Sequence, residues 1–353
     1  MSENVQTPLY IIGNPCCPSA AFIKYINATW SSNQETFKLT GEFNSQQFCL
    51  KNTGIILGEG TYGTVYLYRN KEKTLSAAVK IFESENNVAK LHSSEIGHPF
   101  FPSPTERLSS ANIILTAVFE TFQVMEMGIG TARDFPSKSF PHMIRIFFLE
   151  LLDQRLVCPD IKPDNIIAFK DLYNDDSDTE DDIEYKAADV DSIGCWVSAL
   201  KTDCPEYIGN RIASFPFAGT QQILGYPISD LIQTWYSIII SSYVIQLQYV
   251  KKNMVQNHAL DEIEGMLLNL DHRHFKKRTN RNMTTGDLFI ATHPIHAFAT
   301  KMSEIFSCCI PLYDTINYIR SAFSFTRLPL LSTNKKHIAL VTDILRKSII
   351  DAF

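Results

Sequence analysis

The sequence predicts an α+β fold in which a strand-rich part is followed by a helical part. Short runs of β-branched and aromatic residues, separated by turn residues, fill the chain between residues 54 and 127. From residue 140 onward, apolar residues recur at helical spacing instead. A chain of 353 residues is long enough to bury a substantial core in one large or two modest domains.

Composition and charge narrow the class of protein. Hydrophobic residues make up 45% and charged residues 20% of the chain, which is typical of a globular protein. A net charge of −6 gives no reason to expect a nucleic acid partner. The most apolar run, 235–250, contains interspersed serines and glutamines, so we expect a buried helix and no membrane segment. The N-terminus has no secretory pattern and the eight cysteines include no C-x-x-C, which predicts an intracellular protein, cytoplasmic or nuclear, with reduced thiols.

Five strands are expected in the first part of the chain, and residues 1–48, which show no clean period, are interpreted as an N-terminal extension. The predicted strands cover residues 54–57, 64–68, 75–82, 113–119 and 121–127. A long helix is predicted over 140–157, and another strand over 166–169. The acidic run 171–182 between this strand and the next segment is too charged to pack, which predicts an exposed hairpin insertion.

A glycine-rich turn joins the first two predicted strands. It has the spacing G-x-G-x-x-G, and glycines let backbone N–H groups approach phosphate oxygens because no Cβ intervenes. In dinucleotide-binding folds this motif opens a helix, whereas here a strand follows. The predicted nucleotide-binding residues are Leu57, Gly58, Glu59, Gly60, Thr61, Tyr62, Gly63, Thr64 and Val65. A plain glycine-rich hairpin stays open as the alternative.

A lysine near the end of the next apolar strand is the second candidate for a nucleotide-binding feature. Lys80 closes the run Ala77-Ala78-Val79-Lys80, and a buried lysine without a partner is expensive, although lysines at strand ends also reach out to solvent. The expected carboxylate partner is Glu95, on a predicted helix over 84–96. Glu85 and Glu106 are the competing candidates, and each of these glutamates also suits a solvated helix face.

A polar loop carries the residues that phosphoryl transfer needs. Cys158-Pro159-Asp160-Ile161-Lys162-Pro163-Asp164-Asn165 lies between the helix predicted over 140–157 and the strand predicted over 166–169. Asp160 is a carboxylate that can take a hydroxyl proton, Lys162 a cation for the migrating phosphoryl group, and Asn165 an amide oxygen for Mg²⁺. Polar turns that contain D-x-K are also common without this chemistry.

Taken in order, these parts resemble the eukaryotic-type protein kinase family over roughly residues 50–296. The loop 158–165 is similar to H-R-D-x-K-x-x-N with Cys158 and Pro159 in place of His and Arg, and the segment 77–80 is similar to V-A-I-K. Asp189-Val190-Asp191 stands where D-F-G is expected, and 217–220 and 281–295 resemble the G-T step and the R-x-T…H-P segment. The departures look like those of kinases carried by large DNA viruses, and the G-T and D-L steps resemble the casein kinase 1 and vaccinia-related group.

The resemblance implies a two-lobed fold with a small β-rich N-lobe over 49–127 and a larger helical C-lobe over 128–296, followed by a helical extension over 297–353. It implies a serine/threonine kinase that moves the γ-phosphate of Mg-ATP to a protein hydroxyl. Asp160 would accept the hydroxyl proton and Lys162 would steady the phosphoryl group. Lys80, with Ala78 beside it, would hold the phosphates, Glu95 would pair with Lys80, and Asn165 and Asp189 would hold Mg²⁺.

Two other readings stay open. The changed D-F-G and missing A-P-E fit a pseudokinase that binds nucleotide or serves as a scaffold. A phosphotransferase for small molecules shares the upper lobe and the catalytic aspartate. The basic cluster 272–278 could bind an acidic substrate, nucleic acid or an import receptor, and it also suits a solvated loop.

Overall fold

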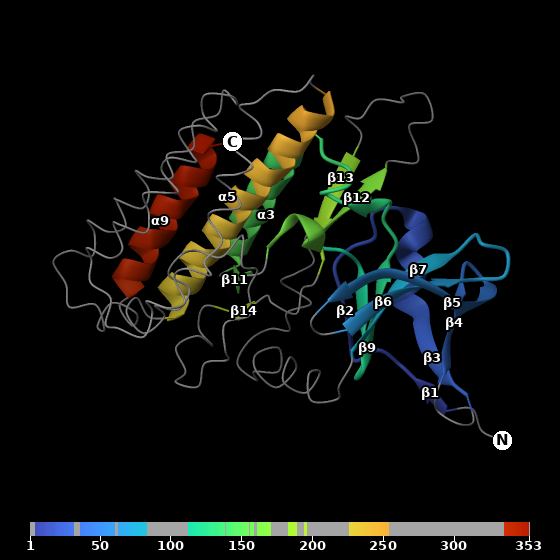
Figure 1. Ribbon diagram of the computed structural model, residues 1–353. Coiled ribbons are helices and arrows are strands. Elements are labelled where there is room, and N and C mark those ends of the chain that lie inside the picture. Colours follow the sequence, from blue (N-terminus) through green and yellow to red (C-terminus); the bar gives the residue numbers. More distant parts are fainter. Residues whose placement is uncertain are drawn as a thin grey trace, which may run out of the picture. The chain divides into compact units, whose positions relative to one another are not determined.

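The computed structural model describes residues 4–31, 36–60, 63–82, 112–137, 139–154, 156–158, 161–170, 183–188, 194–195, 226–253 and 335–352 (Figure 1). The chain divides into two compact units, which are described separately below. The first unit comprises residues 1–130 and 167–188, and the second comprises residues 131–166 and 189–353.

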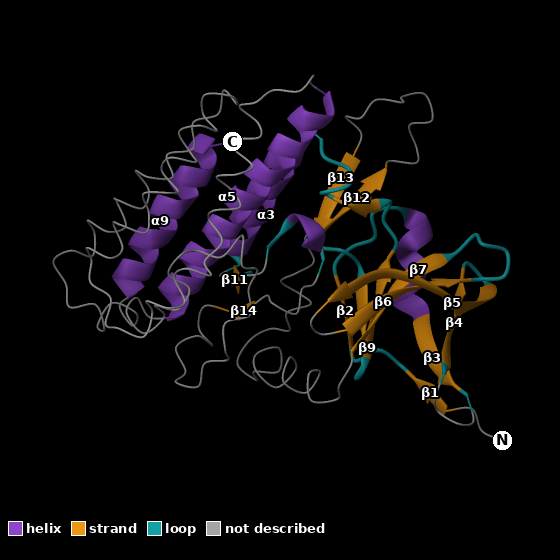
Figure 2. Ribbon diagram, viewed as in Figure 1, coloured by secondary structure: helices purple, strands orange, loops and turns teal. Residues whose placement is uncertain are grey.

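A nine-stranded antiparallel sheet forms most of the first unit (Figures 1 and 2). Its spatial order is β1-β3-β4-β5-β6-β7-β9-β8-β2. The strands are β1 (Asn4–Gln6), β2 (Tyr10–Ile12), β3 (Ile26–Trp30), β4 (Phe37–Phe43), β5 (Gln46–Gly60), β6 (Gly63–Arg69), β7 (Ser76–Phe82), β8 (Thr116–Val118) and β9 (Phe122–Glu126). Strand β5 pairs first with β4 and then, beyond residue 50, with β6, and register shifts between Asn52 and Gly58 bend it.

One face of this sheet carries the main core. Phe22 and Ile23 of the 3₁₀ helix η1 (Pro18–Tyr25) are buried there against side chains of the central strands. The strand residues of this cluster are Ile26, Ala28, Leu39, Phe48, Leu50, Tyr68, Ala77, Val79, Ala117, Phe122 and Val124. Strands β12 (Ile166–Lys170) and β13 (Ile183–Ala187) are neighbours in a separate sheet, and the Ala187 carbonyl accepts a hydrogen bond from Ile114 N at 3.0 Å.

Three packed helices dominate the described part of the second unit (Figure 2). They are α3 (Phe140–Asp153), α5 (Tyr226–Asn253) and α9 (Lys335–Ala352). Helix α3 buries residues that recur three and four apart, among them Phe140, Ile144, Phe147 and Leu151, as expected for an amphipathic helix. The remaining described elements are β10 (Gly130–Thr131), β11 (Leu156–Val157), η3 (Pro163–Asn165) and β14 (Gly194–Cys195).

Several elements match the sequence predictions. The predicted strands 54–57, 64–68, 75–82, 113–119 and 121–127 correspond to parts of β5, β6, β7, β8 and β9. The helix predicted over 140–157 is α3 followed by β11, and the strand 166–169 is β12. The apolar run 235–250 lies in α5, and most of its described side chains are buried. No helix in the described ranges is long and apolar enough to cross a membrane.

The prediction of a two-lobed kinase-like fold is wrong. Strands predominate in the described residues, with a nine-stranded sheet where five strands were expected, and these residues do not form the large helical lobe of the prediction. The extra strands β1–β4 come from residues 1–48. Strand β3 was missed because Thr29 is a buried polar residue and breaks the expected alternation; its hydroxyl is satisfied by Thr40 Oγ1 at 3.0 Å.

The aromatic cluster around Phe122 gives a test of the sheet. Phe122 is 1% exposed, and its ring centroid lies 4.3 Å from those of Phe37 and Phe119. We expect Phe122→Ala to lower the free energy of unfolding by about 3–5 kcal/mol, because it removes a large buried ring and leaves a cavity. Denaturant titration measures this loss. Ile55→Ala, at a position 50% exposed on β5, is the control and should change stability by about 0.5 kcal/mol or less. Equal losses in the two variants would contradict the assigned core.

Candidate nucleotide-binding face and catalytic loop

The glycine-rich turn is the tip of the β5–β6 hairpin. The pairs Gly58–Val65, Glu59–Thr64 and Gly60–Gly63 form the last rungs of this ladder. A Cβ at Gly63 would collide with the Ile81 carbonyl, so the fold itself requires a glycine there. A Cβ at Gly58 would meet nothing within 4 Å, and one at Gly60 only the Gly63 carbonyl at 3.9 Å. The backbone at Gly58 and Gly60 is therefore open on that side, as an approaching phosphate would need.

Lys80 shares one face of the sheet with side chains of β6, β7 and β9. Residues directly opposite in an antiparallel pair point to the same face, and so do residues two apart in one strand. Lys80 is opposite Val65 on β6 and Gln123 on β9, and Ala78, two residues before it, is opposite Met125. We call Val65, Ala78, Lys80, Gln123 and Met125 the Lys80 face. Ala77, Val79 and Val124 point the other way, into the main core.

An apolar cluster lies on the Lys80 face. Its buried members are Ile114, Met125 and Phe169, and partly buried apolar residues pack against them. These partly buried residues are Cys16, Val65, Ala78, Ile167 and Ala188. Val65 and Ala78 were among the predicted nucleotide-binding residues. Cys16, Ile167 and Ala188 were not, because they reach this face only through the tertiary fold.

Close backbone contacts bring β12 to this cluster. Ile129 N donates to the Ala168 carbonyl at 2.9 Å. A Cβ at Gly128 would collide with the Ile167 side chain and lie 2.5 Å from the Ala168 carbonyl oxygen. The glycine thus lets the chain after β9 approach β12, which places Ile167 beside the Lys80 face.

Lys80 is half-buried, and its Nζ lies 5.4 Å from the centroid of the Phe82 ring. The partner predicted from the sequence, Glu95, and its competitors Glu85 and Glu106 lie outside the described residues. The pairing of Lys80 with a glutamate therefore stays a prediction.

In the second unit, hydroxyl groups of α5 hold both flanks of the polar loop. Cys158, which is 2% exposed, donates its N–H to Thr234 Oγ1 at 2.9 Å. Ser241 Oγ donates to the carbonyl of Ile161 at 3.3 Å. Pro159 and Asp160, between these anchors, lie outside the described residues, as does Asp189. Helix α5 thus holds the chain on both sides of these two residues.

The end of the loop is a short 3₁₀ turn. Asn165 is buried in η3, its N–H donates to the Lys162 carbonyl at 2.9 Å, and Lys162 is half-buried. Asp164 is exposed and accepts two hydrogen bonds from the guanidinium of Arg133, at 2.7 and 2.9 Å. The paired donors suit the planar carboxylate, and the ion pair ties the turn at 131–134 to the loop.

Several predicted features lie outside the described residues: Thr61 and Tyr62 of the glycine turn, the acidic insertion 171–182, the G-T step at 217–220, the basic cluster 272–278 and the R-x-T…H-P segment 281–295. Within the described ranges, no group of three or more His, Cys, Asp and Glu residues could hold a metal ion. The proposed Mg²⁺ ligands are an amide and a carboxylate, which are oxygen donors of the type that Mg²⁺ prefers.

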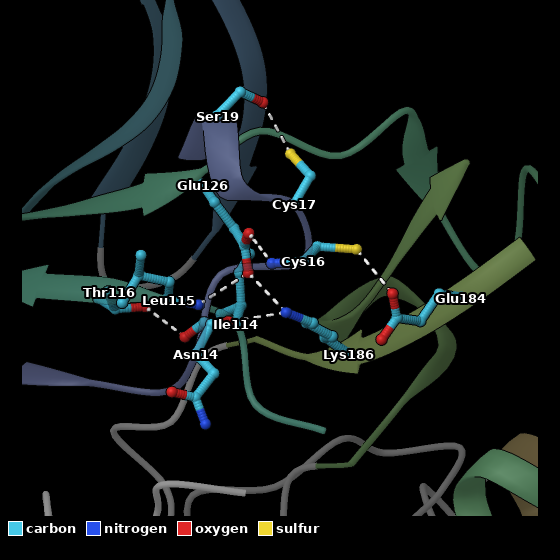
Figure 3. A network of polar contacts seen from close by, with 10 residues as sticks. All are labelled: Asn14, Cys16, Cys17, Ser19, Ile114, Leu115, Thr116, Glu126, Glu184 and Lys186. Atoms are coloured by element: carbon cyan, nitrogen blue, oxygen red, sulfur yellow. Dashed lines mark hydrogen bonds and ion pairs between the residues drawn. The ribbon is translucent and has the colours of Figure 1, made fainter. Parts of the chain in front are cut away.

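A buried polar network lies next to the Lys80 face (Figure 3). The side chains of Glu126, at the end of β9, and Lys186, on β13, are each 1% exposed and lie 3.1 Å apart. Glu126 Oε1 also accepts from Leu115 N at 3.0 Å, and Oε2 accepts from Cys16 N at 2.7 Å. Lys186 Nζ also donates to the Asn14 carbonyl at 2.7 Å and lies 5.6 Å from the Phe169 ring centroid. The charges are therefore paired and hydrogen-bonded, as burial demands.

A sequence signal for this network existed. Glu126 ends the apolar run Phe122–Glu126, and Lys186 interrupts the run Tyr185–Ala187. Charged residues inside strand patterns call for partners. Which charges pair cannot be inferred from local pattern, because the two residues are 60 positions apart.

The thiol of Cys16 belongs to the edge of this network. Cys16 Sγ donates to Glu184 Oε2 at 2.8 Å, while the Cys17 thiol and the Ser19 hydroxyl lie 2.9 Å apart (Figure 3). Burial, and then the hydrogen bond and negative charge of Glu184, raise the pKa of Cys16 well above its ordinary value. The thiol therefore stays protonated at neutral pH.

We expect Cys16 to resist alkylation at pH 7.5, since only the thiolate reacts. In a Cys17→Ser background, iodoacetamide labelling of the peptide that contains Cys16 should be much slower in the native protein than in denaturant. Glu184→Gln removes a negative charge that raises the pKa, so it should lower this pKa and speed labelling. Mass spectrometry of the labelled peptide measures both rates. Native labelling as fast as that of the unfolded chain would contradict the assigned environment.

A scan against protein-family models and a search of curated proteins each found no match. The kinase resemblance therefore rests on the motifs quoted above.

Proposed function

We propose that this protein is a serine/threonine protein kinase, which transfers the γ-phosphate of Mg-ATP to a protein hydroxyl. The observation that carries the proposal is the Lys80 face: a lysine among partly buried apolar side chains, on strands next to a glycine hairpin with open backbone. The fold does not carry it, since the predicted kinase-like fold is wrong.

ATP has three kinds of surface, and the first unit offers a complement to each. The flat base would lie against the apolar side chains of Val65, Ala78 and Ile167, which are all partly buried and so retain exposed surface. The phosphates would accept hydrogen bonds from backbone N–H groups near Gly58 and Gly60. The Lys80 ammonium would offset the phosphate charge.

The loop of the second unit supplies the groups for transfer. Asp160 would accept the proton of the acceptor hydroxyl. At the same time the hydroxyl oxygen would form a bond to the γ-phosphorus, and the bond between this phosphorus and the leaving ADP oxygen would break. Lys162 would offset charge on the migrating phosphoryl group. Asn165 and Asp189 would hold Mg²⁺, which supplies charge neutralisation at the phosphates. The hydrogen bonds from Cys158 to Thr234 and from Ser241 to Ile161 support this role, because they fix the loop's flanks.

A second candidate is a nucleotide-binding pseudokinase. Asp191 stands where a D-F-G element has glycine, and a side chain there resists backbone conformations that glycine allows. This candidate keeps the Lys80 face and the glycine hairpin as a nucleotide site but expects no turnover.

Radiolabel transfer from [γ-³²P]ATP with Mg²⁺ separates these possibilities. We expect wild-type protein to label itself or a generic Ser/Thr acceptor. Asp160→Asn should reduce transfer about 10²- to 10⁴-fold, the usual contribution of a general base, yet keep nucleotide binding in a thermal-shift assay. Lys80→Ala should weaken both.

The matched control is Lys170→Ala, which removes an exposed lysine at the end of β12 and should leave transfer unchanged. Nucleotide binding without transfer in wild type would favour the pseudokinase. Transfer that Asp160→Asn leaves intact would overturn the proposed roles, and phosphorylation of metabolites but no peptide would favour the small-molecule phosphotransferase.

A further inference from the structure

A short stretch near the N-terminus reaches the Lys80 face. We call Gly13–Cys17 the N-terminal strap. It follows β2, and Asn14 forms a parallel bridge with Ile114. Gly13 has φ +76°, and a Cβ there would lie 2.5 Å from the Ile114 carbonyl oxygen, so the backbone path of the strap depends on a glycine. Cys16 then packs against the apolar cluster that contains Val65 and Ala78.

The buried ion pair attaches the strap to β9 and β13 (Figure 3). Glu126 holds the strap through the N–H of Cys16, and Lys186 holds it through the carbonyl of Asn14. If the strap left, Glu126 and Lys186 would each lose a buried hydrogen bond, which is costly for charged groups. The strap is therefore a fixed part of the first unit.

We propose that the N-terminal strap forms one wall of the surface that takes the base of ATP, and that Glu126 and Lys186 are positioning residues for this wall. The inference rests on the proposed nucleotide-binding function. Because Cys16, Val65, Ala78, Ile167 and Ala188 are only partly buried, the strap borders the apolar surface without covering it. A bound base would contact the docked strap, so base binding would stabilise the docked strap and the docked strap would strengthen base binding.

Hydrogen exchange of the full-length protein, with and without Mg-ADP, tests the coupling without any substitution. We expect saturating Mg-ADP to slow exchange of the amides in the strap, that of Cys16 among them, because the bound base packs against the strap. Mg-ADP binding with unchanged exchange there would overturn the inference and leave the proposed nucleotide site standing.

Gly13→Ala tests the same coupling from the other direction. The added Cβ collides with the Ile114 carbonyl and displaces the strap, which should weaken Mg-ADP binding by roughly 5- to 150-fold in calorimetry, the usual range of coupling between two sites. Gly41→Ala, on β4, is the matched control, since its Cβ would also collide with a main-chain carbonyl, that of Tyr25 at the end of η1. It should bind Mg-ADP as wild type does.

The possible outcomes are distinct. An unchanged affinity of Gly13→Ala for Mg-ADP would contradict the inference that the strap forms a wall of the base site. Tighter binding would mean that the strap competes with the base, which would also contradict it. Should Gly13→Ala fail to fold, the exchange measurement on wild type decides alone. Wild-type protein that binds no Mg-ADP would remove the proposed function, and the inference with it.

Discussion

The ion pair between Glu126 and Lys186 is the constraint on which the arrangement of the first unit depends. Both side chains are almost fully buried, so each charge must find its partners inside the protein. Beyond each other, their partners are Leu115, just before β8, and Cys16 and Asn14 in the N-terminal strap, about 100 or more residues earlier in the sequence. Satisfying the two charges therefore fixes where these segments meet, and they meet at the edge of the Lys80 face.

The two faces of the central strands have different roles: one packs in the core, and the other carries the proposed nucleotide site. One face of β7 and β9 carries Ala77, Val79 and Val124 into the main core, which stabilises the sheet. The other face carries Lys80 beside Val65 and Ala78, which are only partly buried. A lysine placed there has a rigid strand behind it and apolar surface beside it, which is the environment that a nucleotide with a flat base and charged phosphates would require. The polar loop of the second unit is likewise held by its neighbours, through Thr234 and Ser241.

Strand positions with regular alternation could be predicted from the sequence, and β5 to β9 were. The N-terminal strands could not, because β3 buries a threonine whose partner on β4 is 11 residues away, and a local pattern does not reveal such a pair. The predicted overall fold was wrong because it was inferred from the order of the motifs, and that order contains no information about β1–β4, which extend the sheet. Val65, Ala78 and Lys80 could be named as candidates from the sequence because motif spacing is local. Cys16, Ile167 and the Glu126–Lys186 pair were missed because only the tertiary fold brings them together.

A double-mutant cycle at Glu126 and Lys186 tests the central claim most directly. Glu126→Met, Lys186→Met and the double variant would each be unfolded in denaturant beside wild type. The account predicts that each single substitution lowers the free energy of unfolding by about 3–5 kcal/mol, because it leaves a buried charge unpaired, and that the double variant loses clearly less than the sum. Small and additive losses would show that the two charges are not a coupled buried pair, and would contradict the account.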